Sequence, residues 1–140
     1  MDLANEYVTL AGASSPTNYT DYNNFVSNQR VVFLQTLMSA PSIDIAIITL
    51  IDSDLDITSS VDPEVMMRWY SMGLYLQYAP VQTPAETWVS VMGRNKYIQA
   101  IYQALYQSGQ DVLANTLYTD NKDFYSPTTQ ELIESILEIS

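Results

Sequence analysis

The sequence has 140 residues, of which 47% are hydrophobic, and this is enough for one globular domain that buries about two-thirds of the surface of the unfolded chain. Sixteen acidic residues against five basic ones give a formal charge of −11, which repels polyanions and argues against nucleic acid or an anionic membrane as a partner. The chain has neither cysteine nor histidine, so disulfides, thiolate metal sites and catalytic sites built on an imidazole are excluded.

The first part of the chain predicts two helices separated by a polar stretch. Residues 3–10 form a short helical run that is stopped by a glycine, two serines and Pro16. Ser27 can cap the second helix, which carries apolar residues at helical spacing and ends at Ala40-Pro41.

The middle of the chain holds one ambiguous stretch and one acidic connection. Residues 43–51 are rich in isoleucine and are compatible with a buried strand. Ser42 as an N-cap and the absence of another convincing strand favour a buried helix instead. Residues 52–61 begin like a calcium loop, but Ile57 stands where that loop needs glycine and Pro63 where it needs glutamate. We therefore interpret them as a solvated linker.

Three later helices begin with the same signal, a capping side chain followed by proline. The pairs are Asp62-Pro63, Thr83-Pro84 and Ser126-Pro127. Glu86 adds a capping box to Thr83, and the helix that starts there is expected to end at Gly93 as its C′ residue.

Another helix follows Gly93, because apolar residues then recur at helical spacing. They are Tyr97, Ile98, Ile101, Tyr102 and Leu105. This helix stops at Gly109, and a further helix covers residues 110–118. Together with the helix after Pro127, seven or eight helices with short links predict an all-α array of antiparallel pairs in two layers, within a single domain of residues 1–140.

Two of the five basic residues, Arg94 and Lys96, lie in or beside the first turn of the helix that follows Gly93. Unpaired backbone N–H groups make this end of a helix electropositive, so a cation is disfavoured there and an anion is favoured. Either an acidic neighbour neutralises the two cations or the site receives an anion. Composition and spacing alone favour the ion pair.

Other conspicuous residues have structural interpretations. Arg68 is expected to clamp an acidic side chain of its own chain, and Trp69 and Trp88 fall on apolar stripes and are expected in the core. The eleven tyrosines are expected to pack between the helical layers. No pair of carboxylates stands out, so a metal-free enzyme that uses carboxylates is only a third hypothesis.

Four segments carry a resemblance to a known family. They are Phe33-Leu34-Gln35-Thr36-Leu37 with Ala40-Pro41, Glu64-Val65-Met66-Met67-Arg68-Trp69, Gly93-Arg94-Asn95-Lys96-Tyr97 and Phe124-Tyr125-Ser126-Pro127-Thr128. In order and spacing they resemble the C-terminal domain of the leukotriene A(4) hydrolase and aminopeptidase B family of zinc metallopeptidases, from about residue 20 onward. The most specific segment has the pattern Gly-Arg-x-Lys-aromatic before an apolar helix.

The resemblance implies an armadillo-like, two-layer α-α superhelix that closes one side of the active-site cleft of a zinc aminopeptidase. In that family the arginine of Gly-Arg-x-Lys binds the terminal carboxylate of a peptide substrate and the lysine assists, and Arg94 and Lys96 match these positions. The implied partners are the catalytic domain of the same polypeptide and the substrate carboxylate.

The chain also departs from the family. The zinc motif His-Glu-x-x-His is absent, so the resemblance places zinc in the catalytic domain, and this chain alone is expected to have no metal site, no catalytic residue and no peptidase activity. Ser126 stands where the family often has a histidine, and a serine there can still cap a helix.

The alternative function is a free-standing α-helical repeat module that binds a protein partner through an exposed apolar flank.

No run of eighteen apolar residues and no signal-peptide pattern is present. We therefore expect a soluble, cytoplasmic protein.

Overall fold

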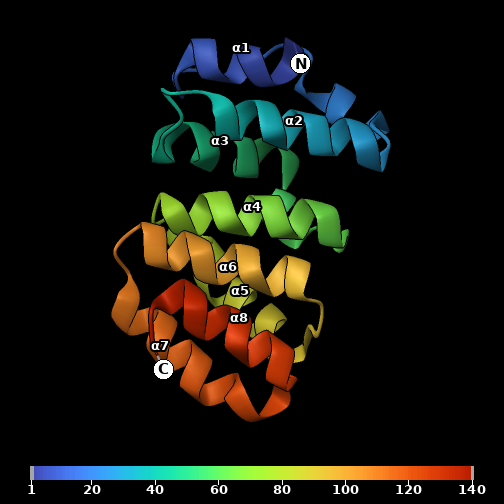
Figure 1. The fold of residues 1–140 in the computed structure, drawn as a ribbon. Coiled ribbons are helices and arrows are strands. Elements are labelled where there is room, and N and C mark those ends of the chain that lie inside the picture. The colour runs from blue at the N-terminus through green and yellow to red at the C-terminus, as the bar shows by residue number, and fades with distance from the viewer. Residues whose placement is uncertain (1, 140) are drawn as a thin grey trace. The chain divides into compact units, whose positions relative to one another are not determined.

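The computed structural model describes residues 2–139, and these form eight α-helices and four short 3-10 turns without a strand among them (Figure 1). The helices are α1 (Asp2–Leu10), α2 (Ser27–Ser39), α3 (Ile45–Leu55), α4 (Pro63–Tyr75), α5 (Gln82–Val91), α6 (Asn95–Gln107), α7 (Asp111–Asn121) and α8 (Pro127–Leu137). The 3-10 turns are η1 (Tyr19–Asn24), η2 (Ile57–Ser59), η3 (Ala79–Val81) and η4 (Lys122–Phe124). The predicted all-α class and helix number are confirmed. None of these helices is long and apolar enough to span a membrane.

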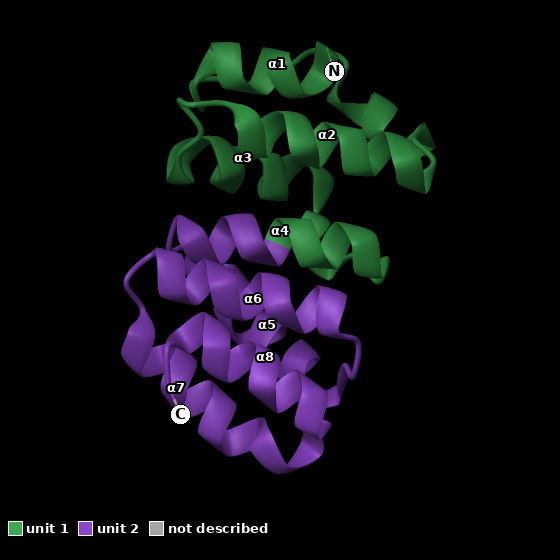
Figure 2. Ribbon diagram, viewed as in Figure 1, with its two compact units in different colours: residues 1–69 green, residues 70–140 purple. Residues whose placement is uncertain are grey.

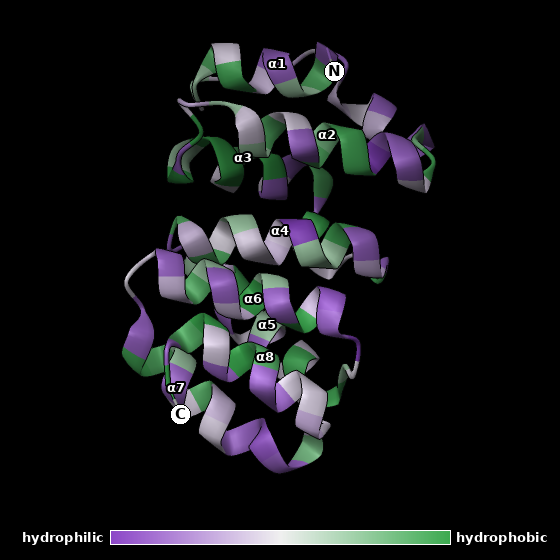
Figure 3. Cartoon of the chain, viewed as in Figure 1, coloured by the Kyte–Doolittle hydropathy of each residue, from purple (hydrophilic) through white to green (hydrophobic). Residues whose placement is uncertain are grey.

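The helices gather in two compact units, residues 1–69 and residues 70–140, and the boundary between the units lies inside α4 (Figure 2). Hydrophobic and hydrophilic residues alternate around most of the helices (Figure 3), as expected for helices that bury one stripe and expose the other. Each unit therefore has its own apolar core. That residues 1–140 act as one domain stays a prediction.

Unit 1, residues 1–69, is built around α1, α2 and α3. Its fully buried side chains include Tyr7, Phe33, Leu34, Leu37, Ile47, Ile48, Ile51 and Trp69. The ring of Phe33 meets Tyr7 and Tyr22 edge to face, with centroids 6.2 Å and 5.2 Å away. Such edge-to-face pairs favour defined ring orientations and stabilise the core beyond the burial of apolar surface.

Residues 45–51 of the isoleucine-rich stretch are helical, as predicted, and form most of α3. Its predicted cap is wrong, because the N-cap is Asp44 and not Ser42. The carboxylate of Asp44 accepts a hydrogen bond of 3.0 Å from the backbone N–H of Ile47. The helix begins where an acceptor reaches its free N–H groups.

The prediction of a solvated linker over residues 52–61 is wrong for residues 52–55, which are helical, and for the buried Ile57. Helix α3 continues to Leu55, and the carboxylate of Asp52 accepts bonds from the N–H and the hydroxyl of Thr58, at 3.0 Å and 2.7 Å. The carboxylate of Asp54 accepts a bond of 2.9 Å from the Tyr7 hydroxyl. These acidic side chains fold the connection by serving as acceptors for nearby donors.

Ser27 does not cap α2, although it was predicted to. The N-cap is Val26, whose N–H donates to the Gln29 side chain at 2.9 Å. The hydroxyl of Ser27 instead donates to Asp62 at 2.6 Å. The same carboxylate accepts a bond from the N–H of Glu64 at 3.0 Å, so the predicted cap at Asp62 is confirmed.

The predicted boundaries of α5 are wrong at both ends. The turn η3 runs directly into the helix, so the N-cap is Val81 and the capping box expected at Thr83 does not form. Pro84 is tolerated because it lies in the first turn, where backbone N–H groups lack helical acceptors. At the other end, Met92 is extended with φ −89° and ψ 126°, so the helix ends without a left-handed glycine at Gly93.

Unit 2, residues 70–140, contains α6 and α8 as side-by-side, parallel helices (Figure 1). Asn95 at the start of α6 is hydrogen-bonded to Thr129 near the start of α8. Tyr106 near the end of α6 is bonded to Glu138, which follows α8. Since α7 returns the chain between them, sequential helices run antiparallel and alternate helices run parallel.

Tyrosines pack the core of unit 2, as predicted. Tyr102, Tyr118 and Tyr125 form a cluster in which the first two rings are edge to face and the last two are stacked. The hydroxyls of Tyr102 and Tyr125 are 3.1 Å apart, and Tyr125 donates to the carbonyl of Val89 at 2.9 Å. These bonds satisfy polar atoms that would otherwise be buried without partners.

Gly73 in α4 provides the first test, because it packs closely against Val81. A Cβ atom at Gly73 would lie 2.6 Å from Cγ2 of Val81, which is fully buried. We expect Gly73→Ala to lower the free energy of unfolding by about 1–3 kcal/mol, even though alanine favours helix by about 1 kcal/mol. Urea unfolding measures the difference.

Gly93→Ala is the matched control, since no atom lies within 4 Å of its Cβ position. Equal stability of Gly73→Ala and the parent chain would contradict the packing.

The buried tyrosines provide a second test, through alkaline pH. Burial raises the pKa of Tyr22 to about 12, and burial together with the neighbouring Tyr125 hydroxyl raises the pKa of Tyr102 further. Above about pH 10 the unfolded chain loses tyrosine protons that the folded chain retains, so the folded state loses stability. The free energy of unfolding should be unaffected by these tyrosines below about pH 10. It should then fall by up to about 1.4 kcal/mol per pH unit for each of them.

Urea unfolding between pH 8 and 11, with tyrosinate absorbance recorded in parallel, measures this fall. Tyr22→Phe should make it shallower. Stability that stays constant up to pH 11 would disprove the effect.

Candidate functional site

The site predicted at Arg94 and Lys96 lies where the chain passes from α5 into α6. Arg94 is the N-cap of α6, in an extended conformation with φ −84° and ψ 124°. Its carbonyl accepts the first helical bonds, from Tyr97 at 3.1 Å and Ile98 at 3.2 Å. The backbone N–H groups of the first turn therefore point out of the helix toward the surface beside Arg94.

Both cations lie against one aromatic ring. The guanidinium carbon of Arg94 is 5.3 Å and the ammonium of Lys96 is 5.7 Å from the centroid of the Tyr97 ring. Tyr97 is buried and its ring lies 5.4 Å from that of Trp88. The structure thus brings the two predicted residues together, with exposed side chains anchored on a buried aromatic residue.

Arg94 lacks an acidic partner in the described part of the chain. Within residues 2–139 no carboxylate forms an ion pair with its guanidinium, whereas Arg68 pairs with Glu64 at 3.1 Å as predicted. The ion-pair interpretation therefore holds for Arg68. For Arg94 the described residues offer no such pair, and an anion site stays a prediction.

A second helix begins beside the first. Ser126 is the N-cap of α8, as predicted, and its hydroxyl oxygen accepts a bond of 3.2 Å from the N–H of Thr129. The Thr129 hydroxyl is 2.9 Å from that of Ser126 and is also bonded to the Asn95 side chain. Because α6 and α8 are parallel, their electropositive N-termini lie at the same end of unit 2.

Sequence reasoning missed Asn95 and Thr129. Thr129 is only 2% exposed and occupies the buried stripe of α8 together with Ile133 and Leu137. A signal was present in the sequence. Thr129, Ile133 and Leu137 follow one another at intervals of four residues on one helix face, and a helix that buries this face is expected to have an apolar residue at each of the three positions. A buried polar group at such a position requires a partner.

The chemistry available at this end of unit 2 is the binding of an anion. It combines a guanidinium, an ammonium and two helix N-termini, a set suited to a carboxylate. Within residues 2–139 no group of three or more histidine, cysteine, aspartate or glutamate side chains is placed to hold a metal ion. The resemblance places the family's zinc in the catalytic domain and not among these residues.

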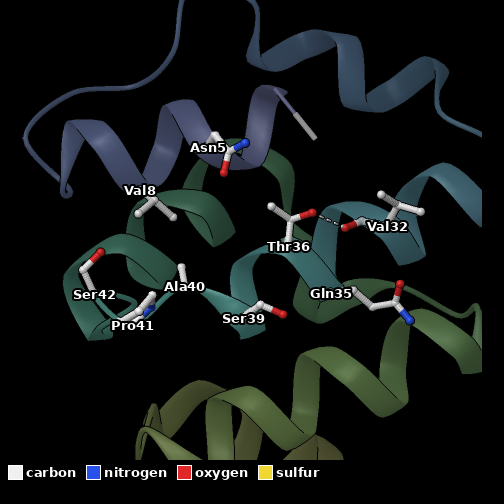
Figure 4. Close-up of a pocket in the computed structure, with 9 residues that line it drawn as sticks. All are labelled: Asn5, Val8, Val32, Gln35, Thr36, Ser39, Ala40, Pro41 and Ser42. Atoms are coloured by element: carbon white, nitrogen blue, oxygen red, sulfur yellow. Dashed lines mark hydrogen bonds between the residues drawn. The ribbon is translucent and has the colours of Figure 1, made fainter.

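Unit 1 contains a separate surface groove of about 560 Å³, beside α1, α2 and the link to α3 (Figure 4). It is lined by Asn5, Val8, Val32, Gln35, Thr36, Ser39, Ala40, Pro41 and Ser42. None of these side chains is charged, so the groove offers neither an acid nor a base nor a counter-ion. It was not predicted from the sequence, because its lining combines residues from two helices and a turn.

Comparison with known proteins relates this geometry to a family. A profile of the family described as "Leukotriene A4 hydrolase, C-terminal" matches residues 25–137. "Leucine aminopeptidase 2" of Yarrowia lipolytica is 29% identical over 97% of this chain, and the protein of the same name from Ajellomyces capsulatus is 28% identical over 96%. The chain spans 23% and 22% of the lengths of these two relatives.

The likeness extends to three dimensions. A solved structure described as native yeast LTA4 hydrolase matches with a TM-score of 0.80 and 22% identity, over 99% of this chain and 25% of that chain. At this identity the match establishes the fold, and it confirms the all-α superhelical class that the resemblance implied. The family profile also covers Arg94, Lys96 and the cap at Ser126. The chain therefore belongs to the family of leukotriene A4 hydrolase C-terminal domains.

Proposed function

We propose that this domain closes one side of the active-site cleft of an aminopeptidase and binds the carboxylate end of short peptide substrates through Arg94 and Lys96. One observation carries the proposal. Arg94 is exposed at the start of α6, rests on the ring of Tyr97 and has no ion-paired carboxylate within residues 2–139. Its guanidinium can therefore meet an anion from outside the chain.

Arginine and lysine would contribute differently. A guanidinium is planar and can form two parallel hydrogen bonds with one carboxylate, so Arg94 would orient the substrate. An ammonium is a compact charge with no fixed direction, so Lys96 would add attraction. The helix N-termini of α6 and α8 would add partial positive charge at the same edge.

Binding at one end of a peptide would position the bond at the other end. With its carboxylate held, a short peptide presents its N-terminal peptide bond at a fixed distance, and the energy of binding is used for orientation. The residues that hydrolyse the bond would belong to the rest of the polypeptide, where the family's zinc also belongs. The relatives are about four times longer than this chain, which agrees with such a division.

Arg94 gives the decisive test, made on the protein as its gene encodes it. Two charge-assisted bonds of about 1.5 kcal/mol each correspond to about 100-fold in kcat/KM. We expect Arg94→Ala to cause a loss of this size for a tripeptide with a free carboxylate and no comparable loss for the same tripeptide amide. Arg94→Lys should lie in between, because it keeps the charge but loses the planar group.

Lys122→Ala is the matched control, because it removes one positive charge from unit 2 at a half-exposed position. It should leave both substrates unaffected. An Arg94→Ala enzyme that hydrolyses the free tripeptide at the parent rate would disprove the substrate role. Peptidase activity in the 140-residue chain alone would contradict the assignment of hydrolysis to the rest of the polypeptide.

The groove of unit 1 favours a second candidate, a free-standing helical module that binds a protein partner. The groove has a volume of about 560 Å³ and an uncharged lining, which suits a neutral protein segment better than it suits an ion. The gene separates the two functions. An upstream reading frame with His-Glu-x-x-His in the same transcript supports the aminopeptidase, and its absence supports the module.

A further inference from the structure

Arg94 can hold a carboxylate at a defined place only if its own backbone is held. It lies in an extended turn between α5 and α6, and its side chain is exposed. The cation–π contact with Tyr97 holds the guanidinium, but it does not fix where the helix N-terminus lies in unit 2. Asn95, the next residue, is bonded to Thr129 of the neighbouring helix.

The bonds around Thr129 are directional. A hydroxyl has one proton to donate, and Thr129 gives that proton to the side-chain oxygen of Asn95. In the contact of 2.9 Å between Ser126 and Thr129 the Ser126 hydroxyl must therefore be the donor. The Ser126 oxygen in turn accepts from the N–H of Thr129 at 3.2 Å. The order is thus Ser126 to Thr129 to Asn95.

We infer that Thr129 is a positioning residue for the carboxylate site, because its buried hydroxyl ties the residue next to Arg94 to the cap of α8. The inference rests on the proposed function. Thr129 is 2% exposed, so water cannot replace a partner that it loses. Holding Asn95 sets the position of the first turn of α6, and with it the direction from which Arg94 approaches a substrate.

The rest of the interface between α6 and α8 does not need this hydroxyl. Ile98 and Ile101 of α6 and Ile133 of α8 are fully buried, and Tyr106 is bonded to Glu138 at the far end. A change at Thr129 should therefore act on the end of the helices where Arg94 lies. Valine has nearly the shape of threonine without the hydroxyl, so it removes the bonds with little change in packing.

The test uses the protein as its gene encodes it, with a tripeptide and the same tripeptide amide as substrates. We expect Thr129→Val to lower kcat/KM for the free acid about tenfold, less than Arg94→Ala does, because a displaced Arg94 still carries its charge. The amide should be hydrolysed at the parent rate, because it has no carboxylate for Arg94 to bind. Thr129→Ser, which keeps the hydroxyl, should restore the parent values. Asn95→Ala removes the acceptor and should reproduce the loss.

Thr119→Val is the matched control, because the hydroxyl of Thr119 is exposed and bonds only to the carbonyl of Asn115, one turn away. It should change neither substrate. Equal losses for both substrates in Thr129→Val and Asn95→Ala, or no loss in either, would overturn the inference. If Thr129→Val fails to fold, Asn95→Ala and Thr129→Ser decide.

Arg94→Ala, measured in the same assays, distinguishes a failure of the proposed function from a failure of the positioning role alone. If it does not distinguish acid from amide, the proposed function fails and the positioning role fails with it. If Arg94→Ala distinguishes the substrates but Thr129→Val and Asn95→Ala do not, only the positioning role fails.

Discussion

The buried hydrogen bonds of Thr129 determine how the N-terminal turns of α6 and α8 meet. On one side Thr129 is bonded to Asn95, and on the other it is bonded to the cap residue Ser126. A sliding of one helix along the other would leave these groups unsatisfied away from water, which is costly. The apolar contacts along the helices lack this directionality, so the polar bonds set the register at this end.

Cations are few in this chain, and the structure uses most of them internally. Arg68 pairs with Glu64, Lys122 lies 3.9 Å from Glu134, and Arg30 stacks over Tyr22 at 4.7 Å from the ring centroid. Arg94 differs from Arg68 and Lys122 because, among residues 2–139, no carboxylate pairs with it. It differs from Arg30, whose guanidinium donates to the backbone carbonyls of Tyr22 and Asn23, because its side chain is exposed. In the proposed function, this exposed arginine on a chain of charge −11 is the group that meets an external anion.

A domain without histidine or cysteine can contribute to peptide hydrolysis through position alone. Binding a carboxylate needs hydrogen-bond donors and positive charge, and both come from arginine, lysine and helix N-termini. Such donors work best on elements that do not move, and α6 and α8 are held together at both ends by side-chain bonds. In the proposed function, these bonds hold the donors in place for the chemistry performed by the rest of the polypeptide.

Local signals explain why much of the fold could be predicted. The spacing of apolar residues predicted the helices, and the pairs Asp62-Pro63 and Ser126-Pro127 predicted two of their starts. The Gly-Arg-x-Lys pattern likewise identified the candidate cations. All these signals act over a few residues, within one or two helical turns.

The caps predicted at Ser27 and Thr83 failed for a different reason. Ser27 is bonded to a carboxylate 35 residues away, and a 3-10 turn starts α5 before Thr83. Thr129 is the clearest such case, because the role of a hydroxyl on an apolar stripe cannot be predicted without knowing that Asn95, 34 residues away, lies beside it. The sequence by itself determined which segments become helices and where charge gathers. Only the tertiary structure decided which polar groups meet, because hydrogen bonds between distant residues depend on how helices pack and leave no periodic pattern in the chain.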